Sequence, residues 1–205
     1  QQIIMKKLSL LLLLVLSFTA VNAQKKEIKE KFKNYTDEKV YTIDGNEIVV
    51  SRVINDVPGT NEEVYIKVKD FFTRNYRSAN AVLQTDDKEA GTIIGKGLFN
   101  NLFQTKSLGI ATGVLKCYHI LRVDIKDNRI SVICSADSWE DFDSKGIFNR
   151  SFLITDYAPF TDKRYWDKGK QMEAFLVLVD EMIDTIDGLE KTVKQGSLTI
   201  ESEDW

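Results

Sequence analysis

Apolar residues recur along this chain with helical spacing in two segments and with a period of two between them. The first helical stripe follows Thr60, which forms the pattern of a capping box with Glu63, and runs to about Arg77. The second follows Thr161 or Asp162, either of which supplies a capping side chain. Both stripes predict amphipathic helices. They consist of Val64, Val68, Phe71, Phe72 and Tyr76 in the first helix and of Met172, Phe175, Leu176, Val179, Met182, Ile183, Ile186 and Leu189 in the second.

Residues 114–135 alternate between apolar and polar side chains around residues 127–128, which predicts a β-hairpin with its turn there. In that register Leu121 faces Cys134. One face is then apolar and is expected to join the core, whereas the other face is mixed. The apolar face carries Leu115, Cys117, His119, Leu121, Val123, Ile125, Ile130, Val132 and Cys134.

The remaining strand signals are weaker. Residues 79–85 and 91–99 predict a second hairpin that turns at 86–89, and its glycines at positions 91, 95 and 97 indicate a bulge or a close approach to a helix. A first strand is expected in residues 40–54, and it is central if its apolar run is buried on both faces. Residues 100–113 are interpreted as a long irregular loop. Residues 137–160 are the hardest to interpret, although 152–154 have the composition of a short strand.

The order strand, helix, four strands as two hairpins, and long helix predicts an α+β fold. We expect a twisted antiparallel sheet of about five strands with both helices on one face, because only one face of the clear hairpin is uniformly apolar.

The first 23 residues have the composition of a secretory signal peptide. Met5 is followed by two lysines, an apolar run over residues 10–16 and small residues up to Ala23. The run is shorter than the roughly 20 residues that span a bilayer, so we expect cleavage after about Ala23 and a periplasmic or secreted protein. Residues 1–4 lie upstream of the expected start at Met5. No cysteine lies near the expected cleavage site, so we expect no lipid anchor of the lipoprotein type.

The expected mature chain divides into three parts. Residues 24–40 are a charged lead-in, expected to be solvated with partial helical character. Residues 41–193 are expected to form a single α+β domain, and residues 194–205 an acidic tail. Gly196, at the start of this tail, is placed to end the last helix.

The net charge disfavours nucleic-acid partners, and the positions of the two cysteines disfavour a disulfide between them. The chain has a formal net charge of −3, and without the two leader lysines 26 basic face 31 acidic residues, about −5. Such a chain has no bulk attraction for nucleic acid. Exported domains often pair their cysteines, but Cys117 and Cys134 lie four residues apart in the predicted register, roughly 13 Å. We therefore predict two buried free thiols.

The run DDKEAGTIIGKG at residues 86–97 and the later turn IKDNRI, within this order of elements, resemble a family of exported Bacteroidetes proteins classed as a domain of unknown function with a TBP-like fold. The resemblance covers roughly residues 48–189 and implies the fold and export. The family has no established catalytic residues to carry over. TBP binds DNA with two tandem copies that form a basic saddle. Since this chain has one copy and is acidic, we expect no nucleic-acid partner.

Two motifs resemble known sites. Gly95 and Lys96 resemble the end of a phosphate-binding loop, but the spacing from Gly91 is one residue short and Gly97 replaces the required hydroxyl. We interpret this run as a bulged strand. Residues 139–143 place acids beside aromatics, as sugar-acting proteins do, and are interpreted as a solvated loop with aromatic anchors.

His119 is the only histidine. A triad with Cys117 or a serine is formally open, but alternation places both residues on the apolar face and no G-x-S-x-G elbow is present. We predict a buried, hydrogen-bonded histidine near the rim of the core. One histidine and two separated thiols do not make a closed zinc site, and no metal or cofactor is expected.

The mixed face of the 114–135 hairpin is the candidate partner surface. Two interpretations remain open: the surface is free, or residues 137–160 or the loop 100–113 pack over it. The residues of this surface are Tyr118, Ile120, Arg122, Arg129 and Ile133.

The leading hypothesis is a non-enzymatic exported module that binds an envelope protein, peptide or other envelope component through this face or the loop 100–113. The alternatives are a hydrolase that uses Asp or Glu and a purely structural envelope domain. No transmembrane segment is expected once the leader is removed.

Overall fold

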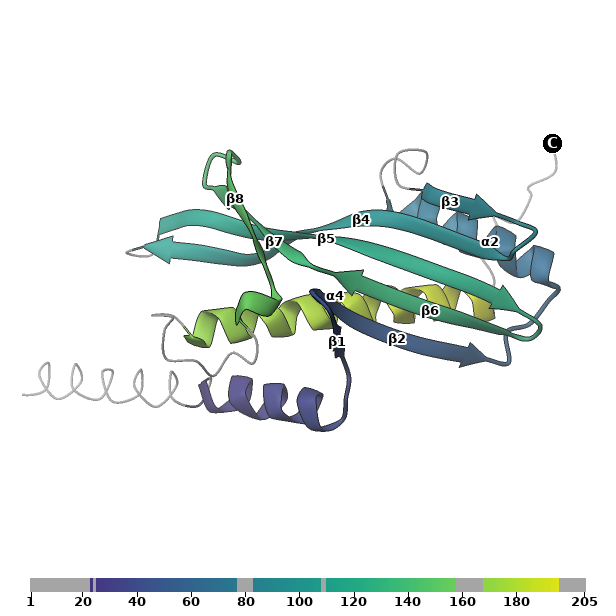
Figure 1. Cartoon of the computed structure of the whole chain (residues 1–205), viewed down its shortest axis with the longest axis horizontal. Helices are drawn as coiled ribbons and strands as arrows, with labels where there is room; N and C mark the ends of the chain where they lie inside the picture. The colour runs from purple at the N-terminus through teal and green to yellow at the C-terminus, as the bar shows by residue number, and fades with distance from the viewer. Residues whose placement is uncertain (1–22, 24, 77–82, 108–109, 158–167, 196–205) are drawn as a thin grey trace, which may run out of the picture.

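The computed structural model describes residues 23, 25–76, 83–107, 110–157 and 168–195 (Figure 1). Residues 25–37 are helical. The elements that follow are β1 (Thr42–Asp44), β2 (Glu47–Asn55), α2 (Asn61–Asn75), β3 (Leu83–Asp87), β4 (Thr92–Ser107), β5 (Ile110–Lys126), β6 (Arg129–Ala136), β7 (Ser138–Asp143), β8 (Phe148–Leu153), the short 3-10 helix η1 (Thr155–Tyr157) and α4 (Lys168–Gln195).

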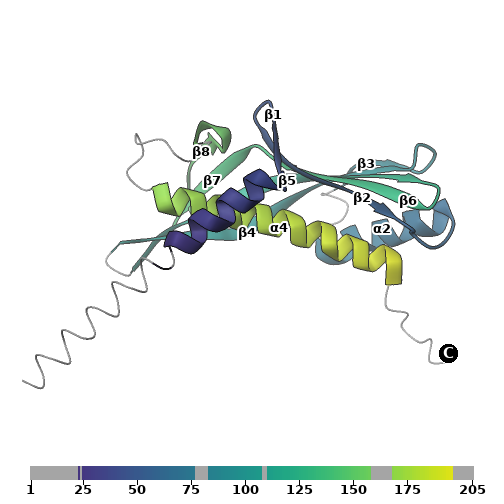
Figure 2. The ribbon, with the colours of Figure 1, turned by 90° about the horizontal axis from the view of Figure 1, so that it is seen from below.

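The sheet has eight strands in the order β1-β2-β6-β5-β4-β3, with β7 paired to β5 and β8 paired to β7, and every pair is antiparallel. Figure 2 shows α2, α4 and the helix of residues 25–37 on the same side of the sheet. The predicted α+β class is confirmed, with more strands than expected. Because the described helices share one side, none of them covers the other side of the central strands.

The β5–β6 hairpin has the predicted register. Leu121 pairs with Cys134, and the turn lies at residues 127–128. The core face is buried, and both Cys117 and Cys134 are free and buried, as predicted. Burial raises the pKa of both thiols, that of Cys134 to about 12. The alternation in the sequence sufficed here because hairpin partners are close along the chain.

Helix α2 begins where the sequence predicts. Thr60 accepts a hydrogen bond from the Glu63 backbone N–H, and the Glu63 carboxylate accepts one from the Thr60 N–H at 2.7 Å. For α4, the predicted cap at residues 161–162 lies outside the described residues, as do 79–82 of the predicted hairpin. The described part of that hairpin is β3 and β4, with a register shift between Leu83 and Thr85.

Three regions differ from the sequence-based expectation. Residues 100–107 and 110–113 are not a loop but continue β4 and β5, and they form with β7 and β8 a four-stranded arm (Figure 1). The arm depends on pairing between β5 and β7, which leaves no periodic signal in the irregular 137–160 sequence. Only the expected short strand at 152–154 overlaps β8. Finally, β2 is not buried on both faces, since Val53 is 55% exposed.

Residues 25–37 were expected to be solvated with partial helical character. They are helical, but Phe32 packs on the core with its ring centroid 6.0 Å from that of Phe175 in α4. Lys31 and Tyr35 both contact Asp180, at 2.5 and 2.7 Å. A narrow apolar stripe among many charges is a weak sequence signal, so the docking onto α4 was not predicted.

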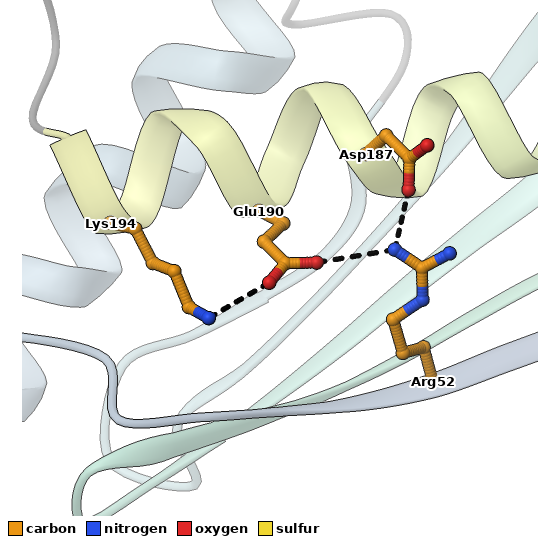
Figure 3. A network of polar contacts seen from close by, with 4 residues as sticks. All are labelled: Arg52, Asp187, Glu190 and Lys194. Atoms are coloured by element: carbon orange, nitrogen blue, oxygen red, sulfur yellow. Dashed lines mark hydrogen bonds and ion pairs between the residues drawn. The ribbon is translucent and has the colours of Figure 1, made fainter.

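Arg52 of β2 ties the sheet to α4 from the helix side. Its guanidinium donates to Asp187 and, at 3.1 Å, to Glu190, and Lys194 contacts Glu190 at 2.8 Å (Figure 3). The hydrogen bond to Asp187 is the main reason that the pKa of Arg52 is raised. Among the helices of the described residues, none is long and apolar enough to cross a membrane.

Candidate functional site

The side of the sheet opposite the helices forms the candidate site, which we call the open face. It is defined by the outward side chains of four neighbouring strands: odd positions 49–55 of β2 and 129–135 of β6, and even positions 118–126 of β5 and 92–98 of β4. The register aligns them in rows, for example Ser51, Ile133, Arg122 and Ile94. Alternation along each strand, together with helices on one side only, produces this surface.

All five residues of the predicted surface lie on the open face. Tyr118 is 43% exposed, Arg122 and Arg129 are exposed, and Ile120 and Ile133 are half-buried. Strands β7 and β8, within the segment that was considered as a cover, instead extend the sheet beside β5. Exposed apolar and aromatic side chains grouped with cations are typical of binding surfaces.

Sequence reasoning missed two members of this face, namely Val53 of β2 and Lys96 of β4, and it placed Lys126 of β5 on the mixed face without including it in the candidate surface. Lys126 alternates in phase with the predicted patch, whereas the place of Lys96 depends on the pairing of β4 with β5, where Lys96 lies opposite Ile120. Val53 could not have been assigned, because its place depends on the pairing of β2 with β6, where Val53 lies opposite Ser131.

The open face contains an ion pair between Arg122 and Asp124 and a contact between Lys96 and the ring of Tyr118. Arg122 pairs with Asp124 through Nε at 2.7 Å and through NH2 at 3.0 Å, and Thr92 donates to the same carboxylate at 2.7 Å. The hydrogen bond from Arg122 is the main reason that the pKa of Asp124 is lowered. Lys96 places its Nζ 4.5 Å from the centre of the Tyr118 ring.

The former phosphate-loop candidate is part of β4, as the strand interpretation predicts. Gly95 and Gly97 point to the helix side and Lys96 to the open face. A Cβ at Gly97 would lie 2.6 Å from Nε2 of His119 and would overlap the Tyr76 ring. Glycine is required at this position by the close approach of two rings and not by a phosphate.

His119 is buried, with 3% of its surface exposed, and its Nε2 lies 2.9 Å from the Tyr76 hydroxyl. This confirms the predicted buried and hydrogen-bonded histidine. Its ring stacks on Phe99 with centroids 3.8 Å apart. Burial lowers the pKa of His119 to about 4, so the imidazole is neutral at pH 7, while the neighbouring Cys117 thiol is protonated. Neither group is therefore an ionised nucleophile or a charged acid near neutral pH.

Residues 139–143 lie in β7 and not in a solvated loop, so that interpretation was wrong. Asp143 accepts hydrogen bonds from the backbone N–H groups of Lys145 and Ile147. Glu140 accepts a hydrogen bond from Ser151 at 3.0 Å, whereas Asp141 lies 3.6 Å from Arg150, and the alternation of β7 directs the two carboxylates to opposite faces. Trp139 is buried. Within the described residues, no three His, Cys, Asp or Glu side chains are grouped as metal ligands would be.

The titration of His119 gives a prediction for stability. The folded pKa of about 4 lies below the ordinary 6.5, so the unfolded chain binds this proton more readily. The contribution to stability is complete above pH 6.5 and is lost as the pH falls towards 4. Between pH 7 and pH 5 the loss should be about 2 kcal/mol.

Denaturant unfolding of the wild type and of His119→Gln at pH 7 and pH 5 measures this loss. The wild type should lose about 2 kcal/mol more than the variant over that interval. Equal losses in both proteins would show that His119 is accessible to protons in the folded state.

Residues 52–135 match the family described as "Domain of unknown function (DUF4468) with TBP-like fold". This segment is similar to the DUF4468 family. The resemblance stated from the sequence is thereby confirmed. The DUF4468 segment extends from β2 through β6 and so contains nearly all of the open face, whereas α4, β7 and β8 lie outside it.

Two solved structures are similar to this chain in fold. A TBP-like protein from Parabacteroides distasonis ATCC 8503 has a TM-score of 0.53 and 15% identity, over 73% of this chain and 96% of that one. A DUF4468 family protein from Bacteroides ovatus ATCC 8483 has a TM-score of 0.50 and 10% identity, over 77% and 94%. Both sources are Bacteroidetes, in agreement with the resemblance. No curated protein matches the chain.

Proposed function

We propose that this chain is an exported binding module, periplasmic or secreted, which binds an envelope protein, peptide or other envelope component through the open face. The observation that carries the proposal is the exposure of Tyr118 and Val53, 43% and 55%, beside the cations of the same face. Tyr118 lies on the central strand β5, where large side chains are usually covered by packed elements, whereas Val53 lies on the part of β2 beyond its pairing with β1. Their exposure next to arginine and tyrosine supports a role in recognition.

Two alternatives have less support. A purely structural domain would be favoured if β7 and β8 covered the open face, but these strands lie beside β5. A hydrolase that uses Asp or Glu would be favoured by a buried carboxylate pair, whereas Glu140 and Asp141 diverge and Asp124 is held by Arg122. The binding surface is also narrower than the sequence suggested, because the expected loop 100–113 is largely part of the arm.

The double variant Tyr118→Ala/Arg122→Ala tests the proposal. In cells that secrete the protein, crosslinking followed by mass spectrometry should show the partners of the wild type reduced at least tenfold for the variant. Ile66→Ala is the control, since Ile66 is 60% exposed on α2, on the helix side. An unchanged partner set with a variant whose unfolding curve matches the wild type would refute the role of the open face.

A further inference from the structure

The open face has the opposite charge to the rest of the chain. The positions that define it hold four cations, Lys96, Arg122, Lys126 and Arg129, and one acid, Asp124, a net of +3. Two further acids, Glu47 and Glu140, lie beside Lys96 and Tyr118 at the end away from the β5–β6 turn. Since the whole chain has a formal net charge of −3, the remainder carries −6. A cationic face on an acidic protein favours partners that present negative charge to this face alone.

Three of the four cations, Arg122, Lys126 and Arg129, lie together at the end of the open face nearest the turn between β5 and β6. A hollow of about 460 Å³ is lined there by Val53, Arg122, Asp124, Lys126, Arg129 and Ser131, among others. Neither Lys126 nor Arg129 forms an ion pair with any residue that the structure describes. Arg122 uses Nε and NH2 for Asp124, which leaves the NH1 group of its guanidinium as a donor. The hollow therefore contains three cations and the Asp124 carboxylate, a net charge of +2, beside the exposed side chain of Val53.

We propose that the partner segment recognised by the open face is an acidic peptide. One carboxylate of the peptide sits in the hollow among Arg122, Lys126 and Arg129, and a neighbouring apolar side chain packs on Val53. This inference rests on the proposed binding function and adds the chemistry of the partner. Guanidinium and ammonium groups are the usual receptors for carboxylates.

A peptide fits this face better than nucleic acid or an anionic membrane. Ile120, Ile133 and Val53 lie between the cations, and Asp124 is in their midst, whereas a phosphate backbone requires an unbroken basic stripe. The charge of −6 on the rest of the chain would also repel an extended polyanion.

Selection from a random peptide library displayed on phage tests the inference with the full exported chain as the target. Selected peptides should be enriched in Asp and Glu. Individual peptides should bind the charge-reversal variant Lys126→Glu/Arg129→Glu at least tenfold more weakly, and their binding to the wild type should weaken as salt rises. Lys29→Glu/Lys191→Glu is the matched control, because it makes the same charge change at exposed lysines on the two other helices. That control should bind like the wild type.

The outcomes separate the two proposals. Selected peptides that require Tyr118 but carry no excess of acids would overturn the acidic partner and leave the binding function standing. Absence of any peptide that requires Tyr118 or Val53 would count against both. The acidic peptide would also be overturned if duplex DNA, phosphatidylglycerol vesicles or a second copy of the chain, seen by sedimentation, bound through Lys126 and Arg129 and the selected peptides did not.

Discussion

Replacing Gly97 by alanine should lower the free energy of unfolding by about 2 kcal/mol. The added methyl group would lie 2.6 Å from Nε2 of His119 and would overlap the ring of Tyr76. Neither ring can move freely, since His119 stacks on Phe99 and Tyr76 stacks on Phe72. Backbone propensity alone predicts the opposite sign, because glycine in a strand is less favourable than alanine by roughly 0.5–1 kcal/mol.

Gly188→Ala is the matched control for this prediction. Gly188 lies inside α4, and a Cβ there would meet Phe71 at 3.4 Å, close to ordinary contact. Helix propensity favours alanine by about 1 kcal/mol, so this variant should be as stable as the wild type or more stable. Denaturant unfolding of both variants decides the matter. A Gly97→Ala protein more stable than the wild type would show that the packing of His119 against Tyr76 is not as described.

Replacing Phe175 by alanine should destabilise the fold by about 4 kcal/mol and release the helix of residues 25–37. Phe175 is fully buried in α4, and its ring contacts Tyr41 at 4.9 Å and Phe32 at 6.0 Å between centroids. The cavity would remove the contact between Phe32 and Phe175 and leave the helix held by the partly buried Ile28 and Tyr35 and by its polar contacts with Asp180. Exposed ion pairs are worth at most about 1 kcal/mol, so we expect these remaining contacts to be too weak to keep the helix docked.

Hydrogen exchange measures both parts of this prediction. In Phe175→Ala, the amides of residues 25–37 should exchange faster than in the wild type. The variant as a whole should also unfold at a lower denaturant concentration than the wild type. Phe148→Ala is the control, because Phe148 is 51% exposed in β8, and its loss should change stability by less than about 1 kcal/mol. Retained protection of residues 25–37 in Phe175→Ala would show that the helix docks through its polar contacts.

The local elements were predictable because their signals are local. The capping box of Thr60 and Glu63 satisfies N–H groups only three residues apart. The β5–β6 register follows from alternation on either side of a short turn. By contrast, the arm was misread as a loop because its stability depends on pairing β5 with β7, and the docking of residues 25–37 depends on α4, more than a hundred residues away.

The same distinction applies to the candidate site. The sequence by itself determined an α+β domain with a TBP-like fold, two buried free thiols, a buried histidine and five residues of one mixed hairpin face. Each of these follows from periodicity within a segment or from a resemblance carried by a short run. Only the tertiary structure decided that the open face includes Val53 and Lys96, and that Arg122, Lys126 and Arg129 surround one hollow. Strand order and the side taken by the helices set that surface, and both arise from long-range pairing that no single segment encodes.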